Sequence, residues 1–348
     1  HTDLIGFDEP GAPPVINLAR LPTTRARLFL SSRAVLDWDI DLDFEQDTTL
    51  YIGDEVVGWV LQEGTPAPAE ALLLRPQPNG GDTLTLPGKV LHYPWDMIHL
   101  NGEQILDDVA FMIDDVFSHD IDEDGVFIVG EHPVVRKGDV VVEPGVVFDA
   151  TEGPIWLEDG VTVRAFSRVS GPMYVGRNSS LLGGVFTGSS IGPTCKVHGE
   201  LEASIILGYS NKAHEGFLGH AYLGMWVNLG AMTTNSDLKN NYGEISMWTP
   251  RGEVETGHVK MGALIGDHVK VAIGTMLNTG SVIGAGSNVF GGMPPKYLHP
   301  FSWGADGEHA FDRFIETTTA AMQRRGVPLN ASQRDMLARA WIRGRARV

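Results

Sequence analysis

The sequence of 348 residues contains a single cysteine, Cys195, so it can form neither an intrachain disulfide nor a cysteine-based zinc site. A reducing, cytoplasmic location fits this composition. No apolar run approaches the roughly 18 residues needed to span a bilayer, and no secretory signal is recognisable. Positive charge is also scarce, because 26 Lys and Arg face 44 Asp and Glu, giving a formal net charge of −18. We therefore expect a small-molecule ligand and neither nucleic acid nor a membrane as partner.

Phosphate-binding glycine motifs are missing as well. The first third of the chain has neither the G-x-G-x-x-G turn nor the P-loop pattern. Its short strand-like runs are Arg27–Leu30, Leu50–Gly53 and Val56–Leu61, and a helical apolar pattern follows over Gly102–Val116. We expect residues 1–118 to form a small α/β appendage with a structural role.

The acidic segment Asp120–Gly125, followed by Glu131, matches the calcium-loop pattern D-x-D-x-D-G-x5-E. A calcium loop of that type needs a helix after it, whereas Val126–Val129 is typical of a strand. We interpret the segment as an acidic domain linker, and an adventitious cation site stays open as the alternative.

A repeat with a period near six begins at about Val134 and continues to Gly291. One aliphatic residue in each block can point inward, and Gly, Asn and Asp supply the corners. This pattern predicts a parallel β-helix of about eight triangular coils, since strands of a β-sandwich alternate at period two. The flat sides of such a prism can pack around a threefold axis, so we expect a homotrimer. The blocks begin at Val140, Val146, Ile155, Val161, Val175, Ile191, Ile265, Val271 and Ile283.

The polar segment Gly208–Gly243 lies within this repeat and interrupts it. Residues 208–220 and 232–260 do not fit six-residue blocks, and insertions into solenoids commonly carry function. We expect the chemistry of the protein to be in this segment.

Several motifs resemble one family of enzymes. They are Gly208–His214, Asn235–Gly243, Ile265–Lys270, Met276–Gly280 and Phe301–Gly304. Together they resemble the sugar-nucleotidyltransferase-like hexapeptide acyltransferases, relatives of the bifunctional UDP-N-acetylglucosamine pyrophosphorylase/glucosamine-1-phosphate N-acetyltransferase. The resemblance implies a left-handed β-helix, a trimer, and acetyl-CoA-dependent N-acetylation of an amino sugar. It divides the chain into a reduced nucleotidyltransferase-like region (1–118), the acyltransferase β-helix (119–304) and C-terminal helices (305–348).

The resemblance also implies roles for individual residues. His214 falls at the position of the general base, Asn228 at that of a substrate-contacting Asn, and Ala231 at that of a backbone contact to the CoA arm. Asn235 and Lys239 lie in a loop that carries polar substrate contacts.

Two positions depart from the family pattern. Phe217 replaces a Tyr, and acidic Glu202 replaces the Lys that holds the sugar phosphate. The short N-terminal region lacks the nucleotidyltransferase signature. We therefore expect no pyrophosphorylase activity, and the acceptor amine is left open.

Acyl transfer to an amine needs a base that titrates near neutral pH and N–H donors for the oxyanion, but no metal. His214 suits the base, with His220 orienting it or acting as the base itself, and the backbone at Gly230–Ala231 can offer the donors. We expect lysines to bind the CoA phosphates. The expected acceptor contacts are Tyr209, Lys212, Asn228, Asn235, Lys239, Asn240 and Tyr242. The expected cofactor contacts are Ala231, Lys260, Lys270, Gly274, Thr275, Ala285 and Lys296.

Two other functions fit parts of the pattern. A zinc enzyme similar to the gamma-class carbonic anhydrases would use three His ligands, namely His214 and His220 with either His198 or His258. A non-catalytic sugar-nucleotide sensor would keep the Asn and Lys contacts and tolerate loss of His214.

The end of the chain has two amphipathic helical patterns. The first covers Glu308–Arg325 and stops before Gly326. The second follows a cap at Ser332, with Asp335 three positions later. The arginines that gather here, including Arg324 and Arg325, are interpreted as solvated helix surface.

Overall fold

The computed structural model describes residues 15, 23–38, 40, 44–115 and 123–345. Contacts divide the chain into two compact units, His1–Asp96 and Met97–Val348. The acidic segment lies partly outside the described residues, because Asp120 and Asp122 are not among them. Glu123 pairs with Arg136 (Oε1–Nη1, 2.5 Å), and the predicted strand that follows is confirmed as β7 (Phe127–Gly130).

The first unit is built on a four-stranded sheet with the order β1-β4-β3-β5. Leu50, Val57 and Trp59 are almost completely buried in it, as expected for strands with one apolar face. A two-stranded ribbon (β2, β6) and a short helix (α1) complete the unit. The bounds are β1 (Arg27–Leu30), β2 (Ala34–Leu36), β3 (Thr48–Ile52), β4 (Glu55–Leu61), α1 (Glu70–Leu74), β5 (Asp82–Thr85) and β6 (Gly88–Val90).

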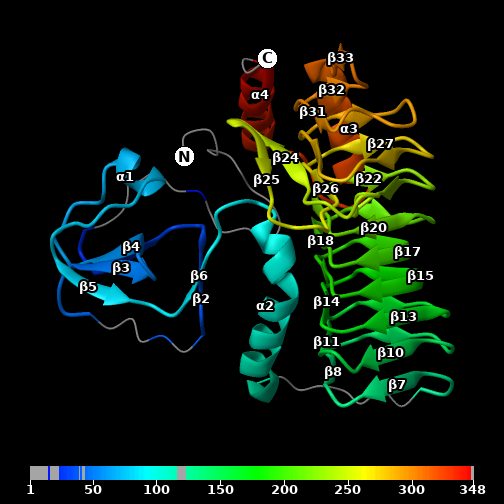
Figure 1. The fold of residues 1–348 in the computed structure, drawn as a ribbon, viewed down its shortest axis with the longest axis horizontal. Helices are drawn as coiled ribbons and strands as arrows, with labels where there is room; N and C mark the ends of the chain where they lie inside the picture. Colours follow the sequence, from blue (N-terminus) through cyan, green and yellow to red (C-terminus); the bar gives the residue numbers. More distant parts are fainter. Residues whose placement is uncertain (1–14, 16–22, 39, 41–43, 116–122, 346–348) are drawn as a thin grey trace. The chain divides into compact units, whose positions relative to one another are not determined.

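The second unit is a β-solenoid of parallel strands, consistent with a left-handed β-helix, so the predicted fold class is confirmed (Figure 1). One face is a nine-stranded parallel sheet, with one strand from each turn. The described solenoid is longer than the eight coils expected, because pairing continues past Gly291 to β31 and β32. The nine strands are β8 (Val134–Arg136), β11 (Ile155–Leu157), β14 (Met173–Val175), β16 (Ser190–Ile191), β18 (Ile205–Gly208), β21 (Tyr222–Met225), β26 (Ala263–Ile265), β29 (Ser281–Ile283) and β31 (Tyr297–Leu298).

Most of the remaining solenoid strands form a second, 14-stranded sheet, which turns a corner within β15 and β17, because each of these pairs with two different strands along its length. A separate two-stranded ladder is formed by β23 (Thr234–Asn235) and β28 (Met276–Leu277). The main path of the 14-stranded sheet runs through β7, β10 (Val147–Ala150), β13 (Ser167–Ser170), β15 (Ser180–Thr187), β17 (Lys196–Glu202), β19 (Asn211–Lys212), β22 (Asn228–Leu229), β27 (Lys270–Val271), β30 (Asn288–Val289), β32 (Ser302–Trp303) and β33 (Gly307–Glu308), with β9 (Val141–Val142), β12 (Thr162–Val163) and β20 (Phe217–Gly219) attached.

Columns of aliphatic side chains fill the solenoid, one from each coil. Val163, Leu181 and Val197 are neighbours in register and are completely buried. Each such side chain contributes about 1.5–3 kcal/mol by leaving water. Because every coil repeats the same inward position, a period near six in the sequence becomes a continuous core.

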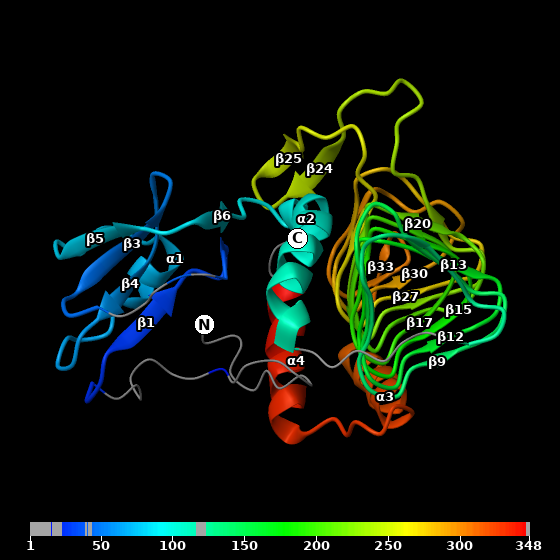
Figure 2. The same ribbon diagram turned by 90° about the horizontal axis from the view of Figure 1, so that it is seen from below.

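The structure corrects one of the two predicted interruptions. Residues 208–220 belong to ordinary coils, since Lys196 pairs with Asn211 and Asn211 with Asn228. Asn228, in contrast, pairs with Lys270, so the extra residues of that coil are those near 232–260. They carry the antiparallel hairpin β24 (Ser246–Thr249) and β25 (Gly252–Glu255), which projects from the solenoid in Figure 2.

Helix α2 (Asp96–Met112), followed by a 3₁₀ turn (Ile113–Asp115), runs along the nine-stranded face (Figures 1 and 2). Ile105 and Val109 of α2 pack on Val135 and Trp156 of the solenoid. The helix begins earlier than the Gly102 predicted, because Asp96 places its carboxylate in the first turn, where the helix dipole favours an acid.

The two tail helices are present as α3 (Phe311–Gln323) and α4 (Ala331–Arg345). Phe314 of α3 and Leu337 of α4 share a buried cluster. The predicted cap at Ser332 is wrong, because Asn330 and Gln333 bond reciprocally, with the Gln333 N–H donating to Asn330 Oδ1 at 2.8 Å. This is a capping box two residues earlier.

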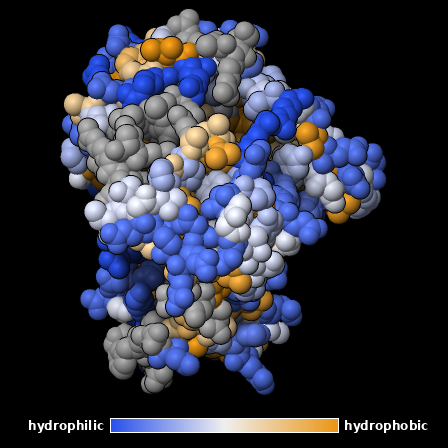
Figure 3. Space-filling view, turned by 90° about the vertical axis from the view of Figure 1, so that its left-hand side faces the viewer, coloured by the Kyte–Doolittle hydropathy of each residue, from blue (hydrophilic) through white to orange (hydrophobic). Residues whose placement is uncertain are grey.

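None of the described helices is long and apolar enough to cross a membrane. Hydrophilic residues cover most of the surface seen in Figure 3, and hydrophobic ones form small patches on it.

Candidate functional site

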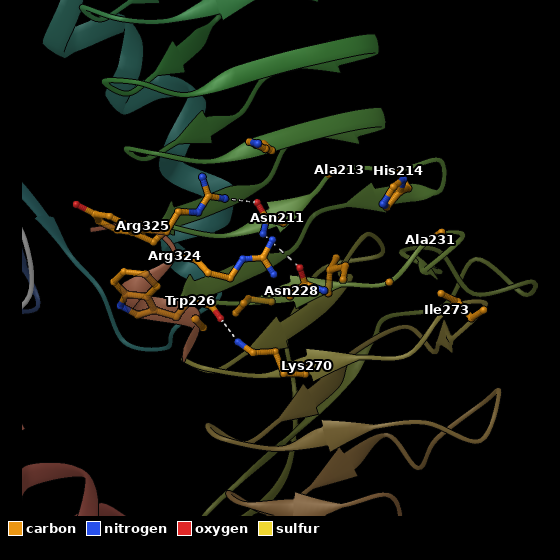
Figure 4. Close-up of a pocket in the computed structure, with 16 residues that line it drawn as sticks. Asn211, Ala213, His214, Trp226, Asn228, Ala231, Lys270, Ile273, Arg324 and Arg325 are labelled. Atoms are coloured by element: carbon orange, nitrogen blue, oxygen red, sulfur yellow. Dashed lines mark hydrogen bonds between the residues drawn. The ribbon is translucent and has the colours of Figure 1, made fainter. Parts of the chain in front are cut away.

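A cavity of about 630 Å³ lies between one face of the solenoid and the end of α3 (Figure 4). His214 and Ala231 line one end of it, and Arg324 and Arg325 line the other. The cavity therefore has a histidine at one end and a basic wall, formed by Arg324 and Arg325, at the other.

The register of the coils explains why distant residues meet in this cavity. Lys196, Asn211, Asn228 and Lys270 pair in sequence across β17, β19, β22 and β27. Since adjacent strands lie about 4.8 Å apart, these four side chains form a polar ladder on the outer face. The residue that follows each of them points into the core instead.

A chain of hydrogen bonds ties α3 to this ladder. Arg325 Nη2 donates to Asn211 Oδ1 at 2.6 Å, and Asn211 Nδ2 donates to Asn228 Oδ1 at 3.2 Å (Figure 4). Lys270 Nζ donates to the carbonyl of Trp226 at 2.5 Å, and burial lowers the pKa of Lys270 to about 8. Arg325 and Lys270 are thus held in place by neutral acceptors, which do not compensate the positive charges of these two side chains.

His214 lies on the exposed turn between β19 and β20 and also lines a second cavity of about 420 Å³. Arg164 and Met232 line this second cavity too. Its wall includes His198, whose Nδ1 contacts the carbonyl of Leu182 at 2.9 Å and whose Nε2 contacts Glu215 Oε1 at 2.8 Å. His214 is therefore placed where two adjoining cavities meet.

The structure does not bring His220 to either cavity. His220 Nδ1 lies 2.8 Å from Asp237 Oδ2, and both side chains are about 12% exposed. The hydrogen bond from His220 lowers the pKa of Asp237. His99 stacks on His258 with ring centroids 3.5 Å apart, and its centroid is 6.1 Å from that of His220.

Of the residues predicted for the site, Tyr209, Asn228, Ala231 and Lys270 line the first cavity with His214. Lys212 lines neither cavity, because its side chain enters the solenoid interior and is only 3% exposed.

The other predicted contacts line neither cavity, although Gly274 N–H donates to the carbonyl of Ala231 at 2.8 Å, and their roles stay predictions. The amide of Asn235 is bonded to the backbone of Gly219. Lys260 Nζ pairs with Glu202 Oε1 at 2.9 Å, Lys296 Nζ donates to the carbonyl of Ser246 at 3.2 Å, and Lys239 donates to that of Glu244. The remaining residues of this group are Asn240, Tyr242, Gly274, Thr275 and Ala285.

The prediction missed Asn211, Lys196, Arg324 and Arg325. Asn211 and Lys196 could have been found by aligning the coils, since they share the phase of Asn228. The two arginines carry no such signal in the sequence, because only the packing of α3 brings them to the solenoid.

The histidines of the zinc alternative separate into two groups in the structure. His198 and His214 line one cavity, whereas His220 and His258 lie with His99. Across the described part of the chain, no group of three or more His, Cys, Asp or Glu residues is placed to hold a metal ion.

We expect the stability of the fold to rise between about pH 8 and pH 9. Burial lowers the pKa of Lys212 and of Lys270 to about 8, so in this range the unfolded chain binds protons that the folded chain has released. Above pH 9 a second contribution lowers the stability as the pH rises. Burial raises the pKa of Cys195, Tyr174 and Tyr222 to about 12, so the folded chain keeps protons there that the unfolded chain releases. Melting temperatures measured in half-unit pH steps check this, and a steady fall from pH 8 to 9 would contradict it.

No model of a known protein family matches this sequence. A protein of Sulfurisphaera tokodaii, named bifunctional sugar-1-phosphate nucleotidylyltransferase/acetyltransferase, is 29% identical over 93 residues. The match covers 27% of this chain and 23% of that protein, so the chain spans about a quarter of the relative's length. This distant similarity agrees with the β-solenoid fold, which fits proteins built from hexapeptide repeats.

Proposed function

We propose that this protein is an N-acyltransferase that uses an acyl-CoA, with acetyl as the acyl group, and acts on the amine of an amino sugar, sugar phosphate or sugar nucleotide. The observation that carries the proposal is the position of His214 between two cavities, one of which ends in a basic wall. The distant relative, whose name includes acetyltransferase, supports the same class of reaction.

In this proposal the acyl-CoA occupies the larger cavity. The phosphates of CoA need local cations, and Lys196, Lys270, Arg324 and Arg325 provide four of them in the lining of this cavity. The thioester then lies toward His214 and Ala231. The acceptor occupies the second cavity, so its amine approaches the thioester carbonyl at the turn that both cavities share.

The chemistry proceeds by direct transfer. The amine nitrogen attacks the thioester carbonyl carbon as His214 takes a proton from the amine. The tetrahedral oxyanion then collapses, the carbon–sulfur bond breaks, and CoA leaves as its thiol after receiving the proton that His214 took from the amine. Gly230 N–H already donates to the Val271 carbonyl at 2.8 Å, so the oxyanion donor that we propose is the N–H of Ala231.

Assembly as a homotrimer belongs to the same proposal. Large apolar side chains that line the two cavities are exposed, with Ile273 of the first cavity 78% and Met232 of the second 60% exposed. A neighbouring solenoid packed on this side would cover them and close the cavities from water. Analytical ultracentrifugation giving a monomer at micromolar concentration would contradict this part of the proposal.

Release of free thiol tests the function directly. We expect at least one amine in a panel of amino sugars, their phosphates and their nucleotide derivatives to release CoA thiol in the presence of an acyl-CoA. The protein contributes no background, since Cys195 is buried and its pKa is raised to about 12. Reactions without amine serve as the control, and no release with any amine or acyl donor would contradict the proposed function.

A further inference from the structure

One inward column of the solenoid contains a charged residue. In register, the column runs through Val163, Leu181, Val197, Lys212 and Leu229 on successive coils. All of these side chains are buried, and Lys212 occupies a position that the other coils give to an aliphatic residue. The repeat therefore favours an apolar side chain here, and Lys212 departs from it.

The ammonium of Lys212 contacts, from inside the solenoid, the backbone of β17 at His198 and the turn that carries His214. Its Nζ donates to the carbonyl of His198 at 2.6 Å and to that of His214 at 3.1 Å. From outside, Glu215 of the same turn contacts His198 Nε2 of β17. The turn that carries His214 is thus fixed on both sides, and Lys212 supplies the interior bonds.

Burying an ammonium is unfavourable, and here the burial lowers the pKa of Lys212 to about 8. A methionine has similar length, would continue the aliphatic column, and would carry no desolvation penalty. Replacing buried charged groups by well-packed apolar ones is often neutral or stabilising. Stability of the column alone therefore does not account for a lysine at this position.

We propose that Lys212 is a positioning residue, which holds the turn bearing His214 at the junction of the two cavities through the carbonyls of His198 and His214. The inference rests on the proposed function, in which His214 is the base. It replaces the predicted role of Lys212 as an acceptor contact. A turn that shifts by about 1 Å can cost roughly 100-fold in rate, so the effect acts on the chemical step.

The Lys212→Met variant tests this role. We expect kcat to fall by about 10- to 100-fold while the KM for acyl-CoA changes little and the melting temperature stays the same or rises. Amide hydrogen exchange should become faster at residues 213–216 and at 198–199, and stay unchanged in the distant coils. The matched control is Leu181→Met, which puts the same side chain in the same column and lines neither cavity.

The outcomes separate the two proposals. Absence of thiol release by the wild-type protein contradicts the proposed function, whereas the exchange measurement still tests the hold of Lys212 on the turn. Wild-type turnover with an unchanged kcat in folded Lys212→Met overturns the positioning role, as does unchanged exchange at residues 213–216. If Lys212→Met does not fold, Lys212→Gln, which keeps one N–H donor group, is measured against the same two criteria.

Discussion

Replacement of His214 by Ala is expected to lower the turnover number by about 10²- to 10⁴-fold, the range typical for loss of a general base. His214 is exposed on its turn, so its removal leaves no cavity in the core and the melting temperature should change little. Steady-state thiol release with saturating acyl-CoA and amine measures the first effect, and thermal unfolding measures the second.

His220→Ala is the matched control for this experiment. It removes the hydrogen bond to Asp237 in a place that lines neither cavity, so we expect a loss of about 1–3 kcal/mol in the free energy of unfolding and near-normal turnover of the folded protein. Near-normal turnover in His214→Ala together with a large loss of turnover in folded His220→Ala would identify His220 as the base. Full turnover in His214→Ala would contradict the proposed mechanism, and tight acyl-CoA or sugar-nucleotide binding without turnover in the wild type would favour the sensor alternative.

The solenoid could be predicted because its signal is repeated. Each coil places an aliphatic residue such as Leu181 or Val197 at the same inward position, and many repetitions of one weak pattern outweigh local ambiguity. The prediction that segment 208–220 interrupts the repeat is nevertheless wrong. Lys212 occupies an inward position there, and a polar residue hides the phase of a repeat that is defined by apolar ones.

Only part of the site could be predicted, and the division follows from how its residues are brought together. Asn228 and Ala231 belong to one coil and Lys270 to the next, and the neighbour relations of coils are fixed by the repeat. Arg325, in contrast, reaches Asn211 only through the packing of α3 on the solenoid, a contact between residues far apart in sequence. An amphipathic pattern shows that a helix has an apolar face but does not show which surface that face will cover.

Arg324 and Arg325 are expected to contribute much of the affinity for acyl-CoA. Replacing both Arg324 and Arg325 by Ala should weaken acyl-CoA binding by on the order of 10²-fold or more, since each charge-assisted bond to a phosphate contributes about 1.5–3 kcal/mol. The turnover number at saturating acyl-CoA should stay within a few-fold, because neither arginine is near His214 (Figure 4). Calorimetric titration with acyl-CoA measures the affinity.

Arg313→Ala is the control for this pair, because Arg313 lies on α3, the helix that Arg324 and Arg325 follow, but is 77% exposed and paired with Glu316. It removes a positive charge without touching the cavity, so acyl-CoA affinity should be unchanged.

Binding of dephospho-CoA, which lacks the 3′-phosphate, shows which phosphate Arg324 and Arg325 contact. If they hold the 3′-phosphate, its removal should weaken binding to the wild type and leave binding to the double variant nearly unchanged. If the arginines hold the pyrophosphate, removal of the 3′-phosphate should weaken binding to the wild type and to the double variant by the same factor. An unchanged dissociation constant for acyl-CoA in the double variant would contradict the assignment of this cavity to CoA. The phosphates would then bind without the two arginines that line the cavity.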